Sequence, residues 1–127
     1  MSPKILFKLL LIGLVMPTVA SAVSDEDFKA KTTKNLINLC TTSSDDPKYK
    51  EAIHFCQGYA VGAYDYYRAA NNGPNGQQLF CFPKPEPSRN EAIEKVVAWA
   101  QQHPEYMSDM PVETEFRALA ELWPCKK

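Results

Sequence analysis

Apolar residues recur every three or four positions along four segments of the chain, and this spacing places them on one face of an α-helix. The four segments span residues 24–40, 47–70, 88–103 and 111–123. Most of the connections between them are short, which favours antiparallel packing of consecutive helices. The pattern therefore predicts an all-α fold, a small four-helix domain.

Polar residues and prolines indicate where these helices begin. The sequence Ser-Arg-Asn-Glu at 88–91 matches a capping box, in which the serine and glutamate side chains satisfy free N–H groups of the first turn. The sequence Ser-Asp-Glu-Asp at 24–27 resembles the same motif. Asp46 precedes Pro47, whose missing N–H costs nothing at the first helical position. Glycines and prolines keep residues 71–87 out of a helix, so we expect a long loop there.

Each predicted helix has an apolar stripe and an opposite polar face. In the last helix, Glu113, Arg117 and Glu121 are spaced to form charge pairs on a solvated face. The residues that we expect to face the core in the first, third and fourth helices are Phe28, Thr32, Leu36, Leu39, Cys40, Ile93, Val96, Val97, Ala100, Val112, Phe116, Leu119, Ala120 and Trp123.

Two glycines lie about one turn apart in the second predicted helix. Gly58 and Gly62 each destabilise a helix interior by about 1 kcal/mol relative to alanine, so a compensating contact is expected. Close approach of another helix of the same fold is the simpler explanation. Close approach of a second copy of the chain is the alternative, because the tyrosines around these glycines cover more than one helical face and suit an interface.

The chain has four cysteines, Cys40, Cys56, Cys81 and Cys125, and their spacing does not fit a metal site. An even number predicts two disulfides, for which three pairings exist. Antiparallel packing returns the end of the fourth helix toward the loop that carries Cys81, which favours Cys81–Cys125 and leaves Cys40–Cys56. Each link would stabilise the domain by roughly 3 to 4 kcal/mol on the chain-entropy model.

The first 22 residues have the layout of a cleavable signal peptide. Lys4 and Lys8 flank the start of an apolar run that ends at Val15, and the small residues Ala20-Ser21-Ala22 follow. The run is well short of the roughly 20 residues that a membrane-spanning helix needs, so no membrane span is expected after cleavage. Residues 23–127 then form one domain in a compartment where cysteines are oxidised.

The charge balance and the histidines exclude several function classes. The mature domain carries 12 basic and 15 acidic residues, a net charge of about −3, without the basic cluster that nucleic acid requires. His54 and His103 lack the nucleophile and orienting group of a catalytic constellation. The sequence therefore predicts a protein that is not an enzyme, with no catalytic residue, no cofactor and no metal site.

Several short motifs occur in a fixed order along the mature chain. They are Cys56-x-Gly58-Tyr59, Phe80-Cys81-x-Pro83, His103-Pro104-Glu105 and Trp123-Pro124-Cys125. Together they resemble the Tai/Rap immunity proteins, which are partners of type VI secretion amidase effectors. The resemblance implies a small helical periplasmic protein of a Gram-negative bacterium, often a homodimer, that binds a secreted peptidoglycan amidase and blocks its active-site groove.

An inhibitor of this kind needs a protruding loop with a preset conformation, because a rigid loop loses less entropy on docking. Residues 103–111 are bracketed by prolines and mix polar with hydrophobic side chains. The longer loop at 71–87, tethered through Cys81, is the alternative. The residues that we expect to bind the partner are Glu105, Tyr106, Met107, Asp109 and Met110.

Other functions are compatible with a small disulfide-bonded helical domain. One is a periplasmic stress chaperone that binds unfolded clients when its carboxylates are protonated at low pH. Another is a carrier of a hydrophobic ligand in an apolar pocket. A third is an orphan binding protein that has no cognate toxin.

Overall fold

Four α-helices form the computed structural model, which describes residues 22–126. The elements are η1 (Asp27–Lys29), α1 (Thr33–Cys40), α2 (Tyr49–Ala70), α3 (Arg89–Gln101), η2 (Pro104–Tyr106) and α4 (Pro111–Leu122), where η1 and η2 are 3-10 turns. No strand occurs in this part of the chain, so the all-α prediction is confirmed. The predicted signal peptide lies outside the described residues, apart from Ala22.

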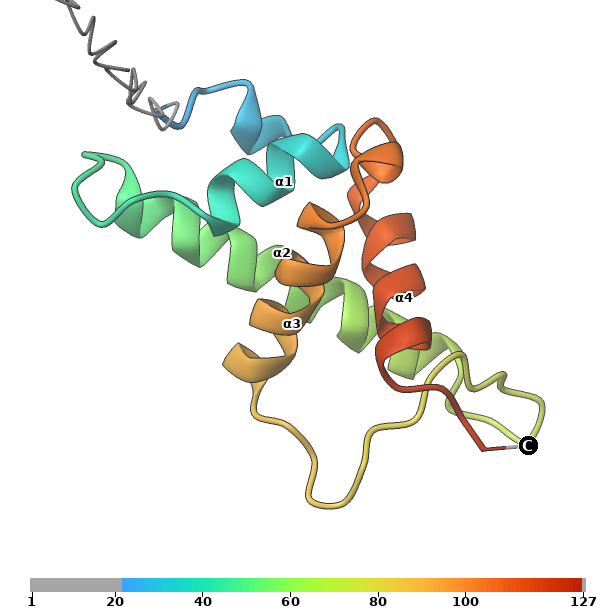
Figure 1. Cartoon of the computed structure of the whole chain (residues 1–127). Helices are drawn as coiled ribbons and strands as arrows, with labels where there is room; N and C mark the ends of the chain where they lie inside the picture. Colours follow the sequence, from blue (N-terminus) through green and yellow to red (C-terminus); the bar gives the residue numbers. More distant parts are fainter. Residues whose placement is uncertain (1–21, 127) are drawn as a thin grey trace, which may run out of the picture.

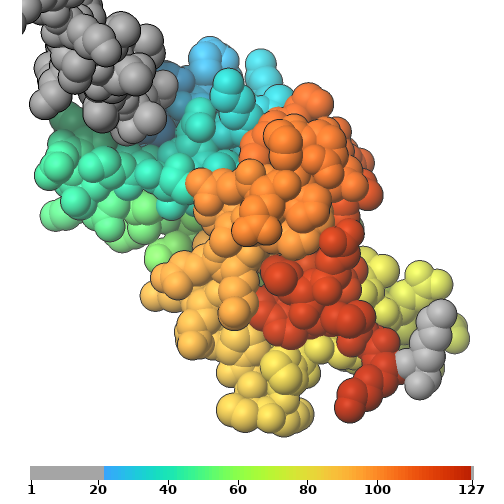
Figure 2. Space-filling model, viewed as in Figure 1, coloured from blue at the N-terminus to red at the C-terminus, as the bar shows by residue number. Residues whose placement is uncertain are grey.

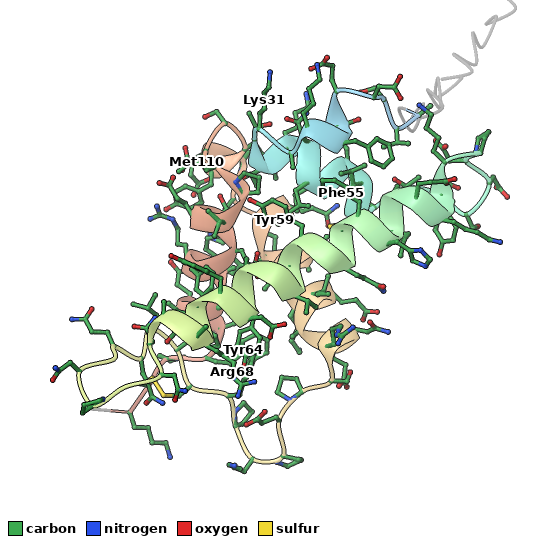
Figure 3. The ribbon with its side chains drawn as sticks, turned by 180° about the vertical axis from the view of Figure 1, so that it is seen from behind. Lys31, Phe55, Tyr59, Tyr64, Arg68 and Met110 are labelled. Carbon is green, nitrogen blue, oxygen red and sulfur yellow. A yellow bond between two sulfur atoms is a disulfide. The ribbon has the colours of Figure 1, made fainter. Side chains whose placement is uncertain are left out.

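The long helix α2 runs along one side of the molecule, and the other three helices pack against its opposite side (Figure 1). Helix α1 lies over the N-terminal half of α2, while α3 and α4 form an antiparallel pair farther along (Figure 1). Seen from behind, α2 lies in front and no other helix covers it (Figure 3). No helix among residues 22–126 has the length and apolar character needed to span a bilayer.

The capping signals of the later helices are confirmed. Ser88 Oγ accepts from the N–H of Glu91, and Glu91 Oε2 accepts from the N–H of Ser88 at 2.8 Å, so α3 begins with the predicted capping box. Helix α4 begins at Pro111, as expected. Helix α2 begins two residues later than predicted, because the Asp46 side chain accepts from the N–H of Lys48 and holds Pro47 in a turn.

The prediction of one continuous helix over residues 24–40 is wrong. Ala30 has a left-handed backbone (φ 43°), which ends η1, and Thr32 then forms a capping box with Asn35 that begins α1. The bend returns Asp27 to the side of α1, where its carboxylate accepts from the side-chain amides of Asn35 and Asn38 and from Ser24. The hydrogen bonds to the buried carboxylate of Asp27 therefore favour a break at Ala30 over one continuous helix.

The apolar core consists of two clusters that meet between the helices. One is centred on Leu39, Ala52 and Cys56, where α1 crosses α2. The other is formed by Ile37, Trp99, Ala100 and Ala118 from α1, α3 and α4.

The buried face of α4 differs from the predicted stripe. Leu119 is buried as expected, but Val112, Phe116 and Ala120 are only half-buried. The positions that are fully buried are Pro111, Thr114, Glu115, Ala118 and Leu119. The helix is turned by about one residue because it contacts α1 and α2 as well as α3.

The two disulfides have the predicted pairing. Cys40–Cys56 joins the end of α1 to α2, and Cys81–Cys125 joins the long loop to the C-terminal segment. Beside the second disulfide, the N–H of Cys81 donates to the carbonyl of Trp123 at 2.8 Å. An aromatic cluster fills the space beneath this loop, formed by Tyr64, Tyr67, Phe80, Phe82, Phe116 and Trp123.

Gly58 and Gly62 do not face another helix of the fold. Both are exposed, and a Cβ atom added at either position would meet nothing within 4 Å. Close approach within the fold is therefore not the explanation for these glycines.

We expect Asp27→Ala to destabilise the domain by about 2 to 4 kcal/mol, because it leaves the amides of Asn35 and Asn38 without their acceptor. Burial alone would raise the pKa of Asp27, but the hydrogen bonds from Ser24, Asn35 and Asn38 more than offset it and lower the pKa. The contribution of Asp27 should thus be present above pH 3.8 and be lost as the pH falls below that value.

Urea unfolding of the wild type and of Asp27→Ala at neutral pH measures this loss. Asp45→Ala, at an exposed position, is the matched control and should stay within about 0.5 kcal/mol of the wild type. Equal unfolding free energies for the two variants would contradict the role given to Asp27.

Candidate functional site

The segment between α3 and α4, residues 102–110, forms a surface loop at one end of the molecule, and we call it the α3–α4 loop. It lies beside the N-terminus of α1 (Figure 1) and is part of the exposed surface there (Figure 2). Its middle is the 3-10 turn η2, in which Tyr106 donates its N–H to the carbonyl of His103. This loop contains all five residues predicted to bind a partner.

Backbone hydrogen bonds join the α3–α4 loop to the first turn of α1. The N–H of Thr33 donates to the carbonyl of Asp109 at 2.8 Å, and the N–H of Lys34 donates to the carbonyl of Met107 at 3.0 Å. The first N–H groups of a helix have no acceptor within the helix itself. The loop supplies two of these acceptors, and its backbone conformation is fixed as a result.

Two buried threonine hydroxyls add a second set of bonds behind this contact. Thr33 and Thr114 are each 2% exposed, and their hydroxyl oxygens lie 2.6 Å apart. The hydroxyl of Thr33 also donates to the carbonyl of Asp109. The hydroxyl of Thr114 is within 3.4 Å of the carbonyl of Tyr106. The loop is thus bound to both α1 and α4 at a position shielded from water.

Aromatic stacking holds the start of the loop. The ring of His103 stacks on Trp99 with centroids 3.8 Å apart, and its Nδ1 donates to the carbonyl of Trp99 at 2.7 Å. Tyr106 lies parallel to Trp99, and the guanidinium of Arg117 lies 4.3 Å above the Tyr106 ring. His103 therefore caps the C-terminal end of α3.

The charge pairs predicted for α4 are replaced by other contacts. Arg117 contacts Tyr106, and Glu121 Oε2 accepts from the indole N–H of Trp99 at 3.1 Å. Neither of the two ion pairs found among residues 22–126 involves α4. Arg117 thus contacts the loop and Glu121 contacts α3, and the two do not pair with each other.

The five predicted partner-binding residues divide into two groups. Glu105 is exposed and Met110 is 55% exposed, so both side chains are available to a partner. Tyr106 and Met107 are half-buried against the core cluster around Trp99, and Asp109 is half-buried.

Sequence reasoning missed the residues that hold this surface in place. The sequence around Thr33 and Thr114 does not predict their contact, because the two positions are 81 residues apart. Lys31 is exposed, and Figure 3 shows it at the same end of the molecule as Met110.

The alternative loop, residues 71–87, is held by a different set of contacts. Tyr67 Oη accepts from the N–H of Leu79 at 2.9 Å and donates to the carbonyl of Gln77 at 3.1 Å. Leu79 is 49% exposed. This loop therefore also offers an apolar side chain to a partner, and it is anchored to the domain by the Tyr67 hydroxyl, by Cys81 and by the aromatic cluster.

A cavity of about 330 Å³ lies between the helices, and a carboxyl group is part of its lining. Glu115 on α4 is 6% exposed, and its Oε2 has no hydrogen-bond partner. Burial raises the pKa of Glu115 to about 8. Burial, and then the charge of Glu115, raise the pKa of Tyr59 on α2, which Figure 3 shows on the side of that helix facing the others.

No sequence signal identified Glu115, because its neighbours on α4 suggested a solvated position. Its burial follows from the turn of α4 described above. Among the described residues, no group of three potential metal ligands lies close together, so the cavity does not have the donors of a metal site.

Residues 32–125 match the family model of the Rap1a immunity proteins. The matched segment includes α1 to α4, both disulfides and the whole α3–α4 loop. No curated protein and no solved structure matches the chain.

We expect Glu115→Gln to flatten the dependence of stability on pH. A carboxyl whose pKa rises from 4.5 to about 8 on folding binds its proton more tightly in the folded state. Its stability contribution is therefore complete below pH 4.5 and is lost as the pH rises toward 8. The melting temperature of Glu115→Gln should exceed that of the wild type by at least about 5 °C at pH 8.

Thermal unfolding between pH 4 and pH 8 measures this difference, with Glu113→Gln as a control that removes an exposed carboxyl from the same helix. The Asp27 contribution changes only below pH 3.8, outside this range. A wild-type melting temperature that does not fall between these pH values would show that Glu115 is not the strained group described here.

Proposed function

The chain belongs to the Rap1a immunity protein family, and on that premise we propose that it binds a secreted peptidoglycan amidase and blocks its active-site groove. The match over residues 32–125 is the observation that carries this proposal. The function is one of binding, in which the protein occupies the groove and excludes the amidase's substrate. Inhibition of this kind requires a surface that fits the groove and loses little conformational entropy when it binds.

The α3–α4 loop meets that requirement through backbone hydrogen bonds to the first turn of α1. Its carbonyls accept from the N–H groups of Thr33 and Lys34, so its backbone is ordered before a partner arrives. A segment that is already ordered avoids the entropy cost of ordering on binding. We therefore assign the amidase contact to the α3–α4 loop.

Of the five predicted residues in this loop, the two exposed ones make the direct contacts. Met110 is an unbranched apolar side chain that adapts to the walls of a groove and is buried when the complex forms. Glu105 contributes a negative charge beside it. Tyr106, Met107 and Asp109 act chiefly through the position of the loop, since they pack on the core or lie partly buried.

The proposed location is the periplasm. Two disulfides are consistent with an oxidising compartment, and the predicted signal peptide would deliver the chain there. Peptidoglycan amidases act in the same compartment, so inhibitor and enzyme would meet where the damage occurs.

We expect Met110→Ala and Glu105→Lys to weaken binding of the cognate amidase, each by roughly tenfold or more in Kd, because central interface residues typically contribute over 1 kcal/mol. Both positions are exposed, so the free energy of unfolding should stay within about 0.5 kcal/mol of the wild type. Isothermal titration calorimetry and inhibition of peptidoglycan hydrolysis are the two measurements.

Leu79→Ala is the matched control, since it removes an apolar side chain of similar exposure from the alternative loop. Loss of affinity in Leu79→Ala with full affinity in Met110→Ala would move the contact to residues 71–87. Absence of binding by the wild type would contradict the amidase proposal itself.

We also propose that a second copy of the chain packs on the uncovered face of α2. Gly58 and Gly62 are exposed there without a compensating contact, and Tyr66 is 77% exposed on the same helix. Glycines at this spacing permit two helices to approach closely, and tyrosine suits an interface. A homodimer formed at this face would leave the α3–α4 loop accessible, because the loop contacts α1 and α4 (Figure 1).

Gly62→Leu should convert a dimer into a monomer while leaving the monomer at least as stable, since leucine is favoured over glycine in a helix by about 0.8 kcal/mol. Light scattering after size-exclusion chromatography reports the mass, and chemical unfolding reports the stability. Lys50→Leu, at an exposed position nearer the start of α2, controls for the added side chain. A wild type that is monomeric at every concentration would exclude this interface.

A further inference from the structure

The cavity around Glu115 does not form part of the surface assigned to the amidase. Its walls are apolar and come from all four helices, with Leu36 on α1, Val61 on α2, Ile93 on α3 and Leu119 on α4. Glu115 is the buried charged residue among them, and its Oε2 is unpartnered. A scaffold built only for stability has no need of this group, because an apolar side chain would fill the space at lower cost.

A buried carboxyl group of this kind needs either a proton or a cation. Neither ion pair of the described residues is near the cavity, since one lies within η1 and the preceding turn and the other at the start of α2. Tyr59, whose pKa is raised by burial and by the charge of Glu115, is neutral at physiological pH and supplies no cation. The cavity thus provides one negative site and no internal partner for it.

Charged residues also line the outer part of the cavity. They are two acids, Asp65 and Glu86, and two bases, Arg68 and Arg89, and all four are exposed. Their charges sum to zero, so the mouth does not select strongly by charge. Figure 3 shows Tyr64 and Arg68 on α2 at the side where the loop before α3 approaches. Glu115 therefore determines the charge of the ligand that the cavity prefers.

The volume indicates the size of the occupant. An apolar cavity of about 150 Å³ accepts benzene, and this cavity is roughly twice as large at about 330 Å³. An aromatic ring with a short alkyl chain matches that volume. A polar head group at the end of the chain would then meet Glu115.

We propose that this cavity is a binding site for a small amphipathic amine, whose hydrocarbon body fills the apolar walls and whose ammonium group pairs with the carboxylate of Glu115. The pair forms in a low-dielectric site, where a charged hydrogen bond is stronger than in water. The ammonium group loses its hydrating water when it enters the cavity. Burial of the hydrocarbon body offsets this free-energy cost.

Binding of an ammonium ligand to Glu115 should release a proton, and this release can be measured. Below pH 8 Glu115 is mostly protonated, so an ammonium ligand displaces one proton from the carboxyl to solvent. Affinity should consequently rise by up to tenfold for each pH unit between 6 and about 8, and level off above that range. A neutral or anionic ligand shows no such rise.

The test uses three probes that share one phenylbutyl group, namely 4-phenylbutylamine, 4-phenylbutanol and 5-phenylvalerate. Each is titrated by calorimetry into the full mature chain across this pH range, in two buffers of different ionisation enthalpy to count the protons released. The amine should bind at least tenfold more tightly than the alcohol and the acid. Glu115→Gln should abolish that preference, and Glu113→Gln should preserve it.

A second variant keeps the test valid if Glu115→Gln does not fold. Ala60→Phe places a ring in the cavity while leaving Glu115 intact, and it should reduce binding of the amine by at least tenfold. The proposal is overturned if the alcohol or the acid binds as tightly as the amine, if no probe binds, or if both cavity variants bind the amine like the wild type.

Discussion

The contact between the first turn of α1 and the carbonyls of the α3–α4 loop supports the rest of this structure. Helix α1 has eight residues, and a helix this short is not stable in water by itself. The loop accepts from the N–H groups of Thr33 and Lys34 at one end of the helix, and Cys40 is bonded to α2 at the other. The contact therefore orders a helix and a loop together, and neither would keep its conformation alone.

Two buried carboxyl groups respond in opposite ways to the cost of removing a carboxylate from water. Asp27 keeps its charge because Ser24 and two asparagines donate to it, whereas Glu115 has apolar neighbours and is driven toward its neutral form. The first arrangement shapes the chain around α1. The second costs stability at neutral pH without shaping any backbone, and unsatisfied groups of that kind are more common at binding sites than in scaffolds.

The sequence predicted features that depend on near neighbours in the chain. The capping box at Ser88 and the start of α4 at Pro111 are of this kind. The two disulfide pairings join distant positions, but they followed from the order of the helices and their antiparallel packing. The break at Ala30 was missed because it depends on hydrogen bonds from Asp27 to α1 that form only in the folded chain. The same holds for the site, where the exposed residues of the loop were found, but Thr33, Thr114 and Glu115 were not. Their roles depend on how α4 packs against α1 and α2, which no local pattern encodes.

The backbone contacts of the α3–α4 loop separate the shape of this surface from its chemistry. Its path is set by carbonyls bound to main-chain N–H groups and buried hydroxyls, while exposed side chains such as those of Glu105 and Met110 take no part in those bonds. Exchanging these side chains leaves the fold intact and changes only what the loop presents to a partner. The backbone of the domain can therefore stay the same while the exposed side chains of the loop change, so a change of binding specificity requires no change of fold.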